Sequence, residues 1–453
     1  MAVPELMESE ASRATAGSTR FFDDFDATSG PSREPEFDFD VAIVGLGYVG
    51  LPTSLVFHAA GRRVLGLDVS HRLKVITEER ADLLATDRER LTWALGDPNF
   101  QITSDAHRLS TAAAVIICVP TPVDEYLVPD LRILEGACAT VVEAAVRGQV
   151  LLLTSTAYVG STRDLLVKPL AARGLRVGID VFVAFSPERI DPGNDRYAHE
   201  DVPRVLGGST PACAGRAAAV LESYAKSVHV VPSAGVAEMS KLLENTFRAV
   251  NIALANEFAE ICQVMGMEVV DVIDAAASKP YGFMPFYPGP GVGGHCIPCD
   301  PHYLLWQLRR ERLSTPVIED AMTALAGRPR RVVGRIWETL CDIGRGHPGA
   351  RVLVLGVAYK PDVQDVRASP AVEVLSELIA AGLIVEYFDP LCATVTLPDG
   401  TTLIGVDDPA GFDADLILAH TLHHGVDLDW LVDQPVVLDA TYRLSHLSNR
   451  VAL

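Results

Sequence analysis

The sequence has no surplus of basic residues. Its 38 Lys and Arg are outnumbered by 59 Asp and Glu, which gives a formal net charge of −21 and a pI of about 4.9. Such a chain cannot neutralise a run of phosphates, so we expect no nucleic acid partner and no binding to anionic membranes. A single small anionic ligand is still compatible, because it needs only a local basic or amide-lined site.

Long apolar runs and a disulfide pattern are also missing. No run approaches the roughly 20 residues of a membrane span, and the N-terminus lacks a charged-then-apolar signal pattern. Eight cysteines scattered over 453 residues do not form the dense framework of a small secreted domain. We therefore expect a cytoplasmic protein with reduced thiols. With 49% hydrophobic residues, the chain can bury two or three cores.

The first 38 residues are rich in Ser, Ala, Asp, Glu, Pro and Gly. Phe21, Phe22 and Phe25 interrupt an acidic run within this stretch. The composition predicts a disordered acidic tail, and the aromatic cluster is compatible with a docking segment.

A strand, a glycine turn and a helix follow. Residues 39–44 form a short apolar run, and 51–55 open a helix. Between them stands Gly-x-Gly-x-x-Gly, from which we select Gly45, Gly47, Tyr48, Val49 and Gly50 as cofactor-binding residues. A second strand at 63–68 ends in Asp68, eighteen residues after the last glycine. This context predicts a dinucleotide site, with the pyrophosphate at the helix N-terminus and the ribose hydroxyls on Asp68. A carboxylate repels a 2′-phosphate, so NAD is favoured over NADP; Arg72 weakens that preference slightly.

Three more apolar runs end in polar residues. Residues 113–119 lead to Pro120 and Thr121, and residues 150–156 end at Thr156. Residues 181–189 carry an acid, Glu188, near their end. Repeated strands with polar tips, separated by helical stretches, predict a doubly wound parallel sheet with its ligand site at the carboxyl edge.

The stretch 285–301 holds four glycines and five prolines in seventeen residues, so it is a loop. It leads to Cys296, with Asp300 four residues later. One interpretation is a structural loop with a buried cysteine. The other is a nucleophile reached by a bulky substrate past a stiff loop that has few side chains.

Residues 236–265 predict a long helix that is apolar on most faces and therefore buried. Glu238, Lys241, Asn245 and Arg248 nevertheless share one stripe. Buried polar groups need partners, so the stripe is either an internal hydrogen-bond network or one wall of an active site.

A second α/β unit begins at 350–360 and lacks Gly-x-Gly-x-x-Gly, so we expect no second dinucleotide there. His420, His423 and His424 cluster after one of its strands, but no carboxylate or cysteine accompanies them at ligand spacing. We expect no metal.

Together these residues resemble the nucleotide-sugar 6-dehydrogenase family, which contains the UDP-glucose and GDP-mannose dehydrogenases. The resemblance covers about residues 40–445. It rests on the motifs at 45–52, 119–122, 186–189, 238–245, 293–300 and 358–370. It implies an α/β protein of two Rossmann-like doubly wound domains joined by a long central helix, and a homodimer. The implied domains are the tail at 1–38, an NAD-binding domain at 39–232, a central dimerisation region with the cysteine loop at 233–330, and a UDP-sugar-binding domain at 331–453.

The family reaction takes an alcohol to an acid in one site and reduces two NAD. Cys296 would attack the intermediate aldehyde to give a thiohemiacetal and then a thioester. Lys241 and Asn245 would stabilise the oxyanion, and Asp300 would act as base or orient water. The resemblance places Glu188 and Thr121 near the reacting carbon and a water. It also assigns Arg367 to the cofactor; the substrate would contact Glu188, Arg189, Lys241, Asn245, Tyr287, Gly293 and Lys360.

Within the family, the loop with His295 and Cys299 resembles the UDP-N-acetylhexosamine branch more than the UDP-glucose enzymes. We therefore expect oxidation of C6 in UDP-N-acetyl-glucosamine or -mannosamine, with the epimer open. Two features depart from the family pattern: Arg443 stands apart from Asp439, and the segment at 123–127 is acidic.

Three alternatives stay open at this point. Cys296-x-x-Cys299 could be half a zinc site or a redox switch; otherwise Cys299 is a small apolar residue behind the nucleophile. A UDP-glucose dehydrogenase, or another nucleotide-sugar dehydrogenase, is the alternative within the family. A non-catalytic binding protein of the same fold should have lost the thiol, the lysine or the acid, and a two-electron dehydrogenase would not need Cys296.

Overall fold

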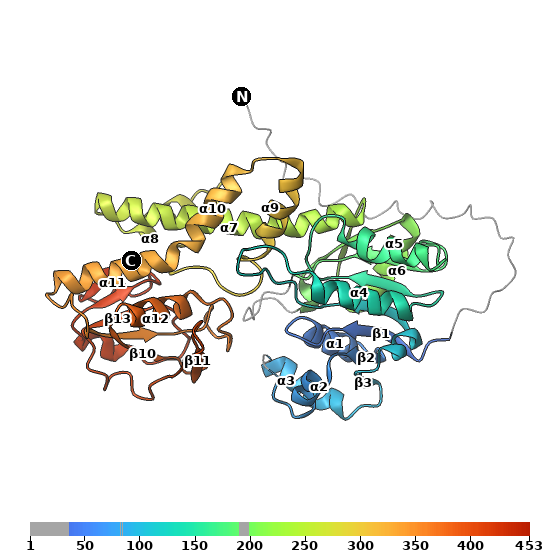
Figure 1. Cartoon of the computed structure of the whole chain (residues 1–453), viewed down its shortest axis with the longest axis horizontal. Coiled ribbons are helices and arrows are strands. Elements are labelled where there is room, and N and C mark those ends of the chain that lie inside the picture. Colours follow the sequence, from blue (N-terminus) through green and yellow to red (C-terminus); the bar gives the residue numbers. More distant parts are fainter. Residues whose placement is uncertain (1–35, 82, 84, 190–198) are drawn as a thin grey trace, which may run out of the picture. The chain divides into compact units, whose positions relative to one another are not determined.

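The structure is a computed structural model that describes residues 36–81, 83, 85–189 and 199–453. Residues 1–35, the greater part of the predicted tail, lie outside the described residues, as does the stretch that follows Arg189. The described chain forms two large sheets, a small two-stranded sheet, and a long helix that lies between the two large sheets in sequence, coloured along the chain in Figure 1. No described helix is both long and apolar enough to cross a membrane.

The first sheet has the strand order β3-β2-β1-β4-β5-β6-β7-β8. Its strands are β1 (Phe39–Val44), β2 (Val64–Leu67), β3 (Phe100–Thr103), β4 (Ala112–Ile117), β5 (Val150–Leu153), β6 (Phe182–Phe185), β7 (Arg204–Gly208) and β8 (Val228–Val231). All neighbours are parallel except β6 and β7. Continuous apolar runs form these strands because helices cover both faces of a parallel sheet. The order reverses between β1 and β4, which is where such sheets bind ligands.

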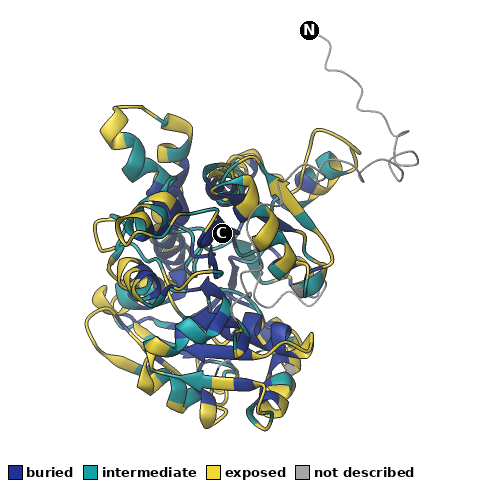
Figure 2. Ribbon diagram, turned by 90° about the vertical axis from the view of Figure 1, so that its right-hand side faces the viewer, coloured by how far each residue is buried: buried dark blue, intermediate teal, exposed yellow. Residues whose placement is uncertain are grey.

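The helices that follow these strands are α1 (Gly50–Ala59), α2 (Ser70–Thr77), α3 (Ala85–Leu95), α4 (Arg132–Ala144), α5 (Lys168–Ala172) and α6 (Pro211–Leu221). Two separate clusters of buried apolar side chains pack on the sheet. Figure 2 shows the strands as the buried interior and the helices as the partly exposed cover.

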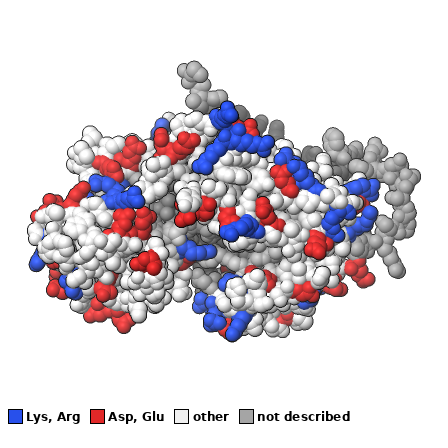
Figure 3. Space-filling model, in the orientation of Figure 1, with Lys and Arg blue, Asp and Glu red and all other residues white. Residues whose placement is uncertain are grey.

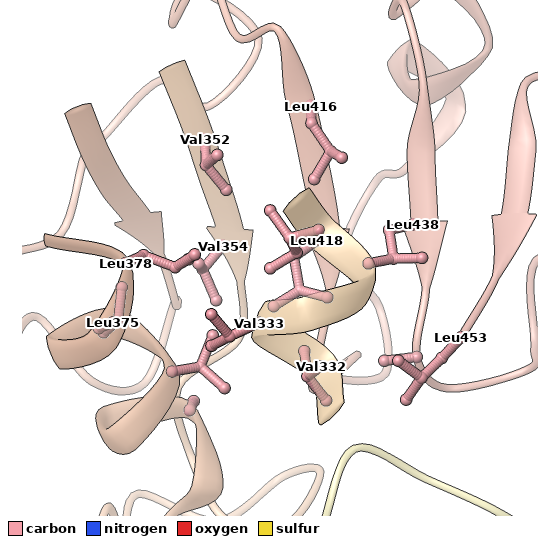
Figure 4. Close-up of a cluster of buried hydrophobic side chains, with 14 of the residues drawn as sticks. Val332, Val333, Val352, Val354, Leu375, Leu378, Leu416, Leu418, Leu438 and Leu453 are labelled. Carbon is pink, nitrogen blue, oxygen red and sulfur yellow. The ribbon is translucent and has the colours of Figure 1, made fainter. Parts of the chain in front are cut away.

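The second sheet is wholly parallel, in the order β10-β9-β13-β14-β15. It consists of β9 (Arg351–Leu355), β10 (Ile384–Phe388), β13 (Leu416–Ala419), β14 (Val437–Asp439) and β15 (Arg450–Ala452). Strands β11 (Thr394–Thr396) and β12 (Thr402–Ile404) form a separate antiparallel pair. Figure 4 shows the core of this domain, in which side chains of α11 (Arg328–Asp342) and α12 (Pro370–Ala380) meet those of the sheet. The predicted fold class of two Rossmann-like domains joined by a central helix is confirmed; the exact domain boundaries stay predictions.

The central helix α7 runs from Ala234 to Met265. The Ser233 hydroxyl accepts a hydrogen bond from the Val236 amide at its start, and Gly266 ends it with φ +71°. The remaining central helices are α8 (Val269–Ala277), α9 (Asp300–Glu311) and α10 (Pro316–Ala326).

The prediction that α7 is buried on most faces is wrong for the single chain. The buried face carries mostly small residues, whereas nine large apolar residues of the helix are exposed: Val236, Met239, Leu243, Phe247, Leu254, Phe258, Ile261, Val264 and Met265. The first seven of these are spaced three, four or seven residues apart and make one continuous stripe along the helix. Sequence periodicity could not distinguish a face that packs within the chain from one left uncovered.

Candidate active site

The glycine turn after β1 has the shape of a dinucleotide site. Gly45 has φ +90°, and a Cβ on it would lie 2.5 Å from the Cys118 carbonyl oxygen. A Cβ on Gly50 would lie 1.8 Å from the Gly45 carbonyl oxygen, so both positions require glycine. Around Gly47, by contrast, no atom lies within 4 Å of an added Cβ. The turn is therefore closed toward the protein and open on the side where α1 presents its N-terminus to a pyrophosphate.

Asp68 follows β2 at the same edge. Its Oδ2 accepts a 2.6 Å hydrogen bond from the Leu46 amide, and its Oδ1 accepts one of 2.7 Å from Val69. Arg72 donates through Nε to the Leu46 carbonyl oxygen at 2.9 Å. A carboxylate has about four acceptor sites, so Asp68 can also accept ribose hydroxyls while the turn holds it in place. The residues present fit an NAD cofactor.

The ends of β4 and β5 complete this edge. The Ser155 hydroxyl accepts a 2.9 Å bond from the Val119 amide and donates one of 2.8 Å to the Val119 carbonyl oxygen, which ties the two strand ends together. The Tyr303 hydroxyl of α9 donates a 3.4 Å hydrogen bond to the carbonyl oxygen of Pro122, the residue after Thr121. The cofactor edge thus contacts the helix that follows the cysteine loop. The cofactor roles of Pro120 and Thr156 stay predictions.

Cys296, Asp300, Lys241 and Asn245, predicted from distant parts of the sequence, are brought together. The Cys296 carbonyl oxygen accepts hydrogen bonds from the amides of Cys299 (3.2 Å) and Asp300 (2.8 Å), a turn that starts α9. Asp300 is only 3% exposed, and its Oδ2 accepts a hydrogen bond from Asn245 Nδ2. Lys241, one turn earlier on α7, lies close enough to both Cys296 and Asp300 to perturb their titration.

The electrostatics of this cluster follow from burial. Burial and the Asp300 carboxylate raise the pKa of the Cys296 thiol to about 11, against the opposing effect of Lys241. Burial also raises the pKa of Asp300 to about 6, although Lys241 and the Asn245 hydrogen bond lower it. At neutral pH the thiol is therefore protonated and Asp300 is ionised. A thiol needs to lose its proton to act as a nucleophile, and a buried carboxylate beside it is a suitable acceptor.

The polar stripe on α7 has two roles, one for each end. Glu238 is buried and accepts hydrogen bonds from the Gly160 amide (2.6 Å), the Ser161 hydroxyl (2.9 Å), and both the amide and the hydroxyl of Thr162 (2.9 and 2.7 Å). It therefore anchors the segment 160–162. Lys241 and Asn245 face the cysteine turn instead, and Arg248 lies near enough to lower the pKa of Cys296. The hydrogen-bond interpretation of the stripe holds for Glu238, and the active-site interpretation stays a prediction for Lys241, Asn245 and Arg248.

The glycines of the cysteine loop fit closely against protein. A Cβ on Gly293 would lie 2.6 Å from the Cβ of Tyr359 and 2.7 Å from the Ala368 carbonyl oxygen. Gly294 has φ +77° and donates from its amide to the Arg367 carbonyl oxygen at 3.1 Å. These glycines permit close packing on the loop after β9. A substrate contact of Gly293 stays a prediction.

The loop after β9 also carries Arg367, which it places at the glycine turn that follows β1. Its guanidinium carbon lies 5.6 Å from the centre of the Tyr48 ring, and its Nη2 donates to Asp365 Oδ2 at 2.6 Å. The His295 ring meets the Tyr48 ring edge-on, with centroids 6.4 Å apart. Burial and the positive charges of Arg367 and Lys241 lower the pKa of His295. Arg367, assigned to the cofactor by resemblance, thus lies over a residue of the predicted cofactor site.

Glu188 and Arg189 have partners that the sequence did not indicate. Glu188 accepts hydrogen bonds from the Arg189 amide at 2.7 Å and from the buried Arg204 guanidinium. Arg189 itself pairs with Glu244 of α7 and donates to the Pro203 carbonyl oxygen at 3.1 Å. Arg204 is a functional candidate that sequence reasoning missed, because its strand register is not visible in the sequence.

Two predicted substrate residues are not brought to Cys296 by any described contact. The Tyr287 hydroxyl donates to Asp274 Oδ1 of α8 at 2.6 Å. Lys360 is half-buried in the loop after β9. Their roles stay predictions.

The second glycine turn is built differently from the first. A Cβ on Gly356 would lie 1.8 Å from the Thr421 carbonyl oxygen. Asp389, the counterpart of Asp68, is buried and accepts from the amides of Val357 (2.8 Å) and Ala358 (3.0 Å) and from His423 Nε2 (3.1 Å). Although burial opposes it, these bonds lower the pKa of Asp389 to about 2. A carboxylate so occupied has little capacity left for a ribose.

The histidine cluster is accounted for by local bonds. The Nδ1 of His423 accepts from the Asp362 amide at 2.9 Å, and His424 pairs with the Asp362 carboxylate. Burial lowers the pKa of His420 to about 3. Within the described part of the chain, no group of three or more His, Cys, Asp or Glu is arranged to hold a metal ion.

The thiols of Cys296 and Cys299 are both poorly reactive in this state. Burial and Asp300 raise the pKa of Cys299 to about 11, as for Cys296. All eight cysteines are free thiols. Cys299 is only 8% exposed, and this burial favours its interpretation as a small buried residue behind Cys296; the redox switch stays open to experiment.

Comparison with known proteins now places the chain. The NAD binding, central and UDP binding domains of the UDP-glucose/GDP-mannose dehydrogenase family match residues 39–226, 235–324 and 353–446. The chain belongs to this family. It is therefore an NAD-dependent nucleotide-sugar dehydrogenase, and the predicted family, enzyme class and cofactor are confirmed.

Three of the proteins to which the chain is similar are named for different N-acetylated sugars. UDP-N-acetyl-D-glucosamine 6-dehydrogenase from Pseudomonas aeruginosa is 34% identical to the chain. The alignment covers 84% of this chain and 90% of that enzyme. The chain is 31% identical over 89% of its length to 96% of an NDP-N-acetyl-D-galactosaminuronic acid dehydrogenase from Ralstonia solanacearum. The structure of UDP-D-ManNAc dehydrogenase from Pyrococcus horikoshii superposes with a TM-score of 0.82 at 31% identity, covering 91% of this chain and 98% of that one.

Proposed function

We propose that this nucleotide-sugar dehydrogenase oxidises the C6 hydroxyl of a UDP-N-acetylhexosamine to the uronic acid, with two NAD reduced per sugar. The cluster of Cys296, Lys241, Asn245 and Asp300 is the observation that carries the proposal. The N-acetylated sugars named for the relatives, and the His295 loop, support the branch. The three relatives differ in the sugar they name, so the epimer is left to experiment.

The first oxidation gives an aldehyde at C6, and the chain must hold it. Cys296 adds to the aldehyde carbon, its proton passes to Asp300, and a thiohemiacetal forms. Lys241 and Asn245 would stabilise the negative charge on the C6 oxygen, because a cation and an amide donor favour an oxyanion in a buried site. Bound NAD supplies the hydride acceptor for each of the two oxidations.

The second oxidation gives a thioester on Cys296. Water then attacks the acyl carbon and the C–S bond breaks. The acid is released, and the Cys296 thiol is restored. We assign the orientation of this water to Glu188 and Thr121, and a proton-accepting role in both half-reactions to Asp300. Covalent capture explains why the site needs a cysteine, since a free aldehyde could escape between the two oxidations.

The stoichiometry of NADH tests this proposal. Purified protein is incubated with NAD and a panel of UDP- and GDP-sugars, and NADH is counted per sugar consumed. Two NADH per UDP-N-acetylhexosamine is the expected result. Turnover with UDP-glucose alone would refute the assignment to the N-acetylhexosamine branch. Full turnover by Cys296→Ser would refute the covalent mechanism and favour a two-electron dehydrogenase.

We further propose a cytoplasmic homodimer formed through the exposed stripe of α7. A continuous row of exposed large apolar side chains usually marks an interaction surface, and the same face of a second copy would cover it. The eight free thiols agree with a reducing compartment. On the surface shown in Figure 3, acidic and basic side chains are interspersed rather than gathered into one basic field.

A further inference from the structure

The antiparallel strand β7 places an arginine at the cofactor edge of the first sheet. Ala184 pairs with Gly208 and Phe185 with Gly207. The same register, continued past the end of β6, puts Glu188 opposite Arg204, the first residue of β7. Had β7 run in the same direction as β6, its first residue would lie at the opposite edge of the sheet.

The ion pair between these residues is buried at Arg204 and partly buried at Glu188. Arg204 is 2% exposed, and its Nη1 donates to Glu188 Oε1. The Arg189 amide donates to the same oxygen at 2.7 Å. Two donors on one oxygen restrict the rotation of the carboxylate, so its orientation is set by the sheet rather than by solvent.

Arg204 is itself supported from the cofactor helix. Its guanidinium carbon lies 5.4 Å from the centre of the Tyr224 ring, and the Tyr224 ring packs on Phe57 of α1 with centroids 4.4 Å apart. The contacts therefore run from α1, whose N-terminus lies at the glycine turn, to the Glu188 carboxylate. An arginine held on an aromatic face loses little freedom when it binds a carboxylate.

The pair lies within electrostatic reach of the end of β4. Burial raises the pKa of the Cys118 thiol to about 12; Glu188 adds to this rise and Arg204 opposes it. Cys118 directly precedes the segment with Pro120 and Thr121. The charged or titratable groups near Glu188 include Arg204 from β7, Cys118 directly after β4, Tyr224 after α6, and the Arg189–Glu244 pair.

We propose that Arg204 is a positioning residue that fixes the Glu188 carboxylate for attack of water on the thioester. The inference rests on the proposed function, because it assigns Arg204 to the hydrolytic step of that reaction. Arg204 contacts neither substrate nor thiol in this role. It acts by holding Glu188 in one orientation, and a misplaced group in an active site can lower a rate by about 10²-fold.

Arg204→Met tests the inference through the kinetics of NADH release. If Arg204 serves hydrolysis, the two oxidations proceed while the thioester accumulates. We expect a burst approaching two NADH per active site, then steady-state turnover lowered at least tenfold. Intact-mass spectrometry should show Cys296 carrying the acyl group. Guanidinium ion at millimolar concentration should restore turnover in this variant, whereas urea at the same concentration should not.

Matched variants separate positioning from folding. Arg216→Met removes another guanidinium held over an aromatic ring, that of Phe182 at 5.1 Å, and should keep wild-type kinetics. Arg204→Lys keeps the charge without the planar fork and should give intermediate turnover, and it replaces the methionine variant if that one does not fold. The double variant Arg204→Met/Glu188→Gln removes both charges of the ion pair, so neither is left without its partner. Its steady-state turnover should be no slower than that of Glu188→Gln alone.

The outcomes are distinct from failure of the proposed function. If the wild-type enzyme reduces no NAD with any nucleotide sugar, the proposed function and with it this role of Arg204 are wrong. Beside an active wild type, normal steady-state turnover in Arg204→Met or Arg204→Lys overturns the inference. A loss of activity without a burst and without rescue by guanidinium overturns it as well, since that result marks a merely structural arginine.

Discussion

The Asp300 carboxylate should destabilise the folded protein at the pH at which the enzyme works. Its pKa rises from the ordinary 3.8 to about 6 because the group is buried. The folded state therefore binds a proton more tightly than the unfolded state between these two values. The contribution of Asp300 to the free energy of unfolding therefore falls as pH rises from about 4 to about 6, and it is constant above that range.

The magnitude can be worked from this shift. A difference of about two pKa units corresponds to about 3 kcal/mol at pH 7.5, and to about half of that at pH 5. Asp300→Asn keeps the shape and an oxygen to accept from Asn245, but it does not titrate. We therefore expect this variant to be more stable than the wild type by up to about 3 kcal/mol at pH 7.5, while its kcat falls by at least 100-fold.

Thermal unfolding of both proteins at several pH values is the assay. The variant should melt several degrees above the wild type at pH 7.5, and the gap should shrink at pH 5 and disappear near pH 4. Asp271→Asn, on the exposed surface of α8, is the control and should show no such pH-dependent gap. A variant that is no more stable than the wild type at pH 7.5, or a gap in melting temperature that does not change with pH, would show that the Asp300 charge does not destabilise the folded protein.

Three further predictions test other parts of the site. Glu238→Gln weakens the bonds to residues 160–162, so the melting temperature should fall while kcat of the folded enzyme changes less than threefold; a large loss of kcat without loss of stability would show that Glu238 belongs to the reaction. Cys299→Ala should recover from peroxide with reductant as well as the wild type does, measured as NADH formation; failure of the variant alone to recover would restore the redox switch. Leu243→Asp, at a side chain 63% exposed on α7, should shift the mass measured by light scattering from dimer to monomer, whereas Glu89→Lys, exposed on α3, should not; an unchanged dimer would place the interface elsewhere.

Local patterns predicted the elements well, because each depends on neighbours in the sequence. The run at residues 39–44, the glycines at 45–50 and Asp68 obey spacing rules, and all lie where the rules place them. The cluster of Cys296, Asp300, Lys241 and Asn245 was predicted from resemblance, and the structure adds which atoms meet. Arg204 could not be predicted, because its place depends on the direction of one strand in the sheet.

The two glycine turns show how one architecture gives different sites. In the first, Asp68 binds the backbone amides of Leu46 and Val69 and keeps acceptor sites for a ribose. In the second, Asp389 is fully enclosed by backbone amides and His423, and the carbonyl of Thr421 occupies the space beside Gly356. The carboxylate that would recognise a ligand in one domain thus stabilises the loop in the other. That loop carries Arg367, whose carbonyl oxygen accepts from the Gly294 amide of the cysteine loop and whose guanidinium lies over the Tyr48 ring, so a rigid second turn lets the domain hold Arg367 against the first glycine turn rather than bind a second dinucleotide.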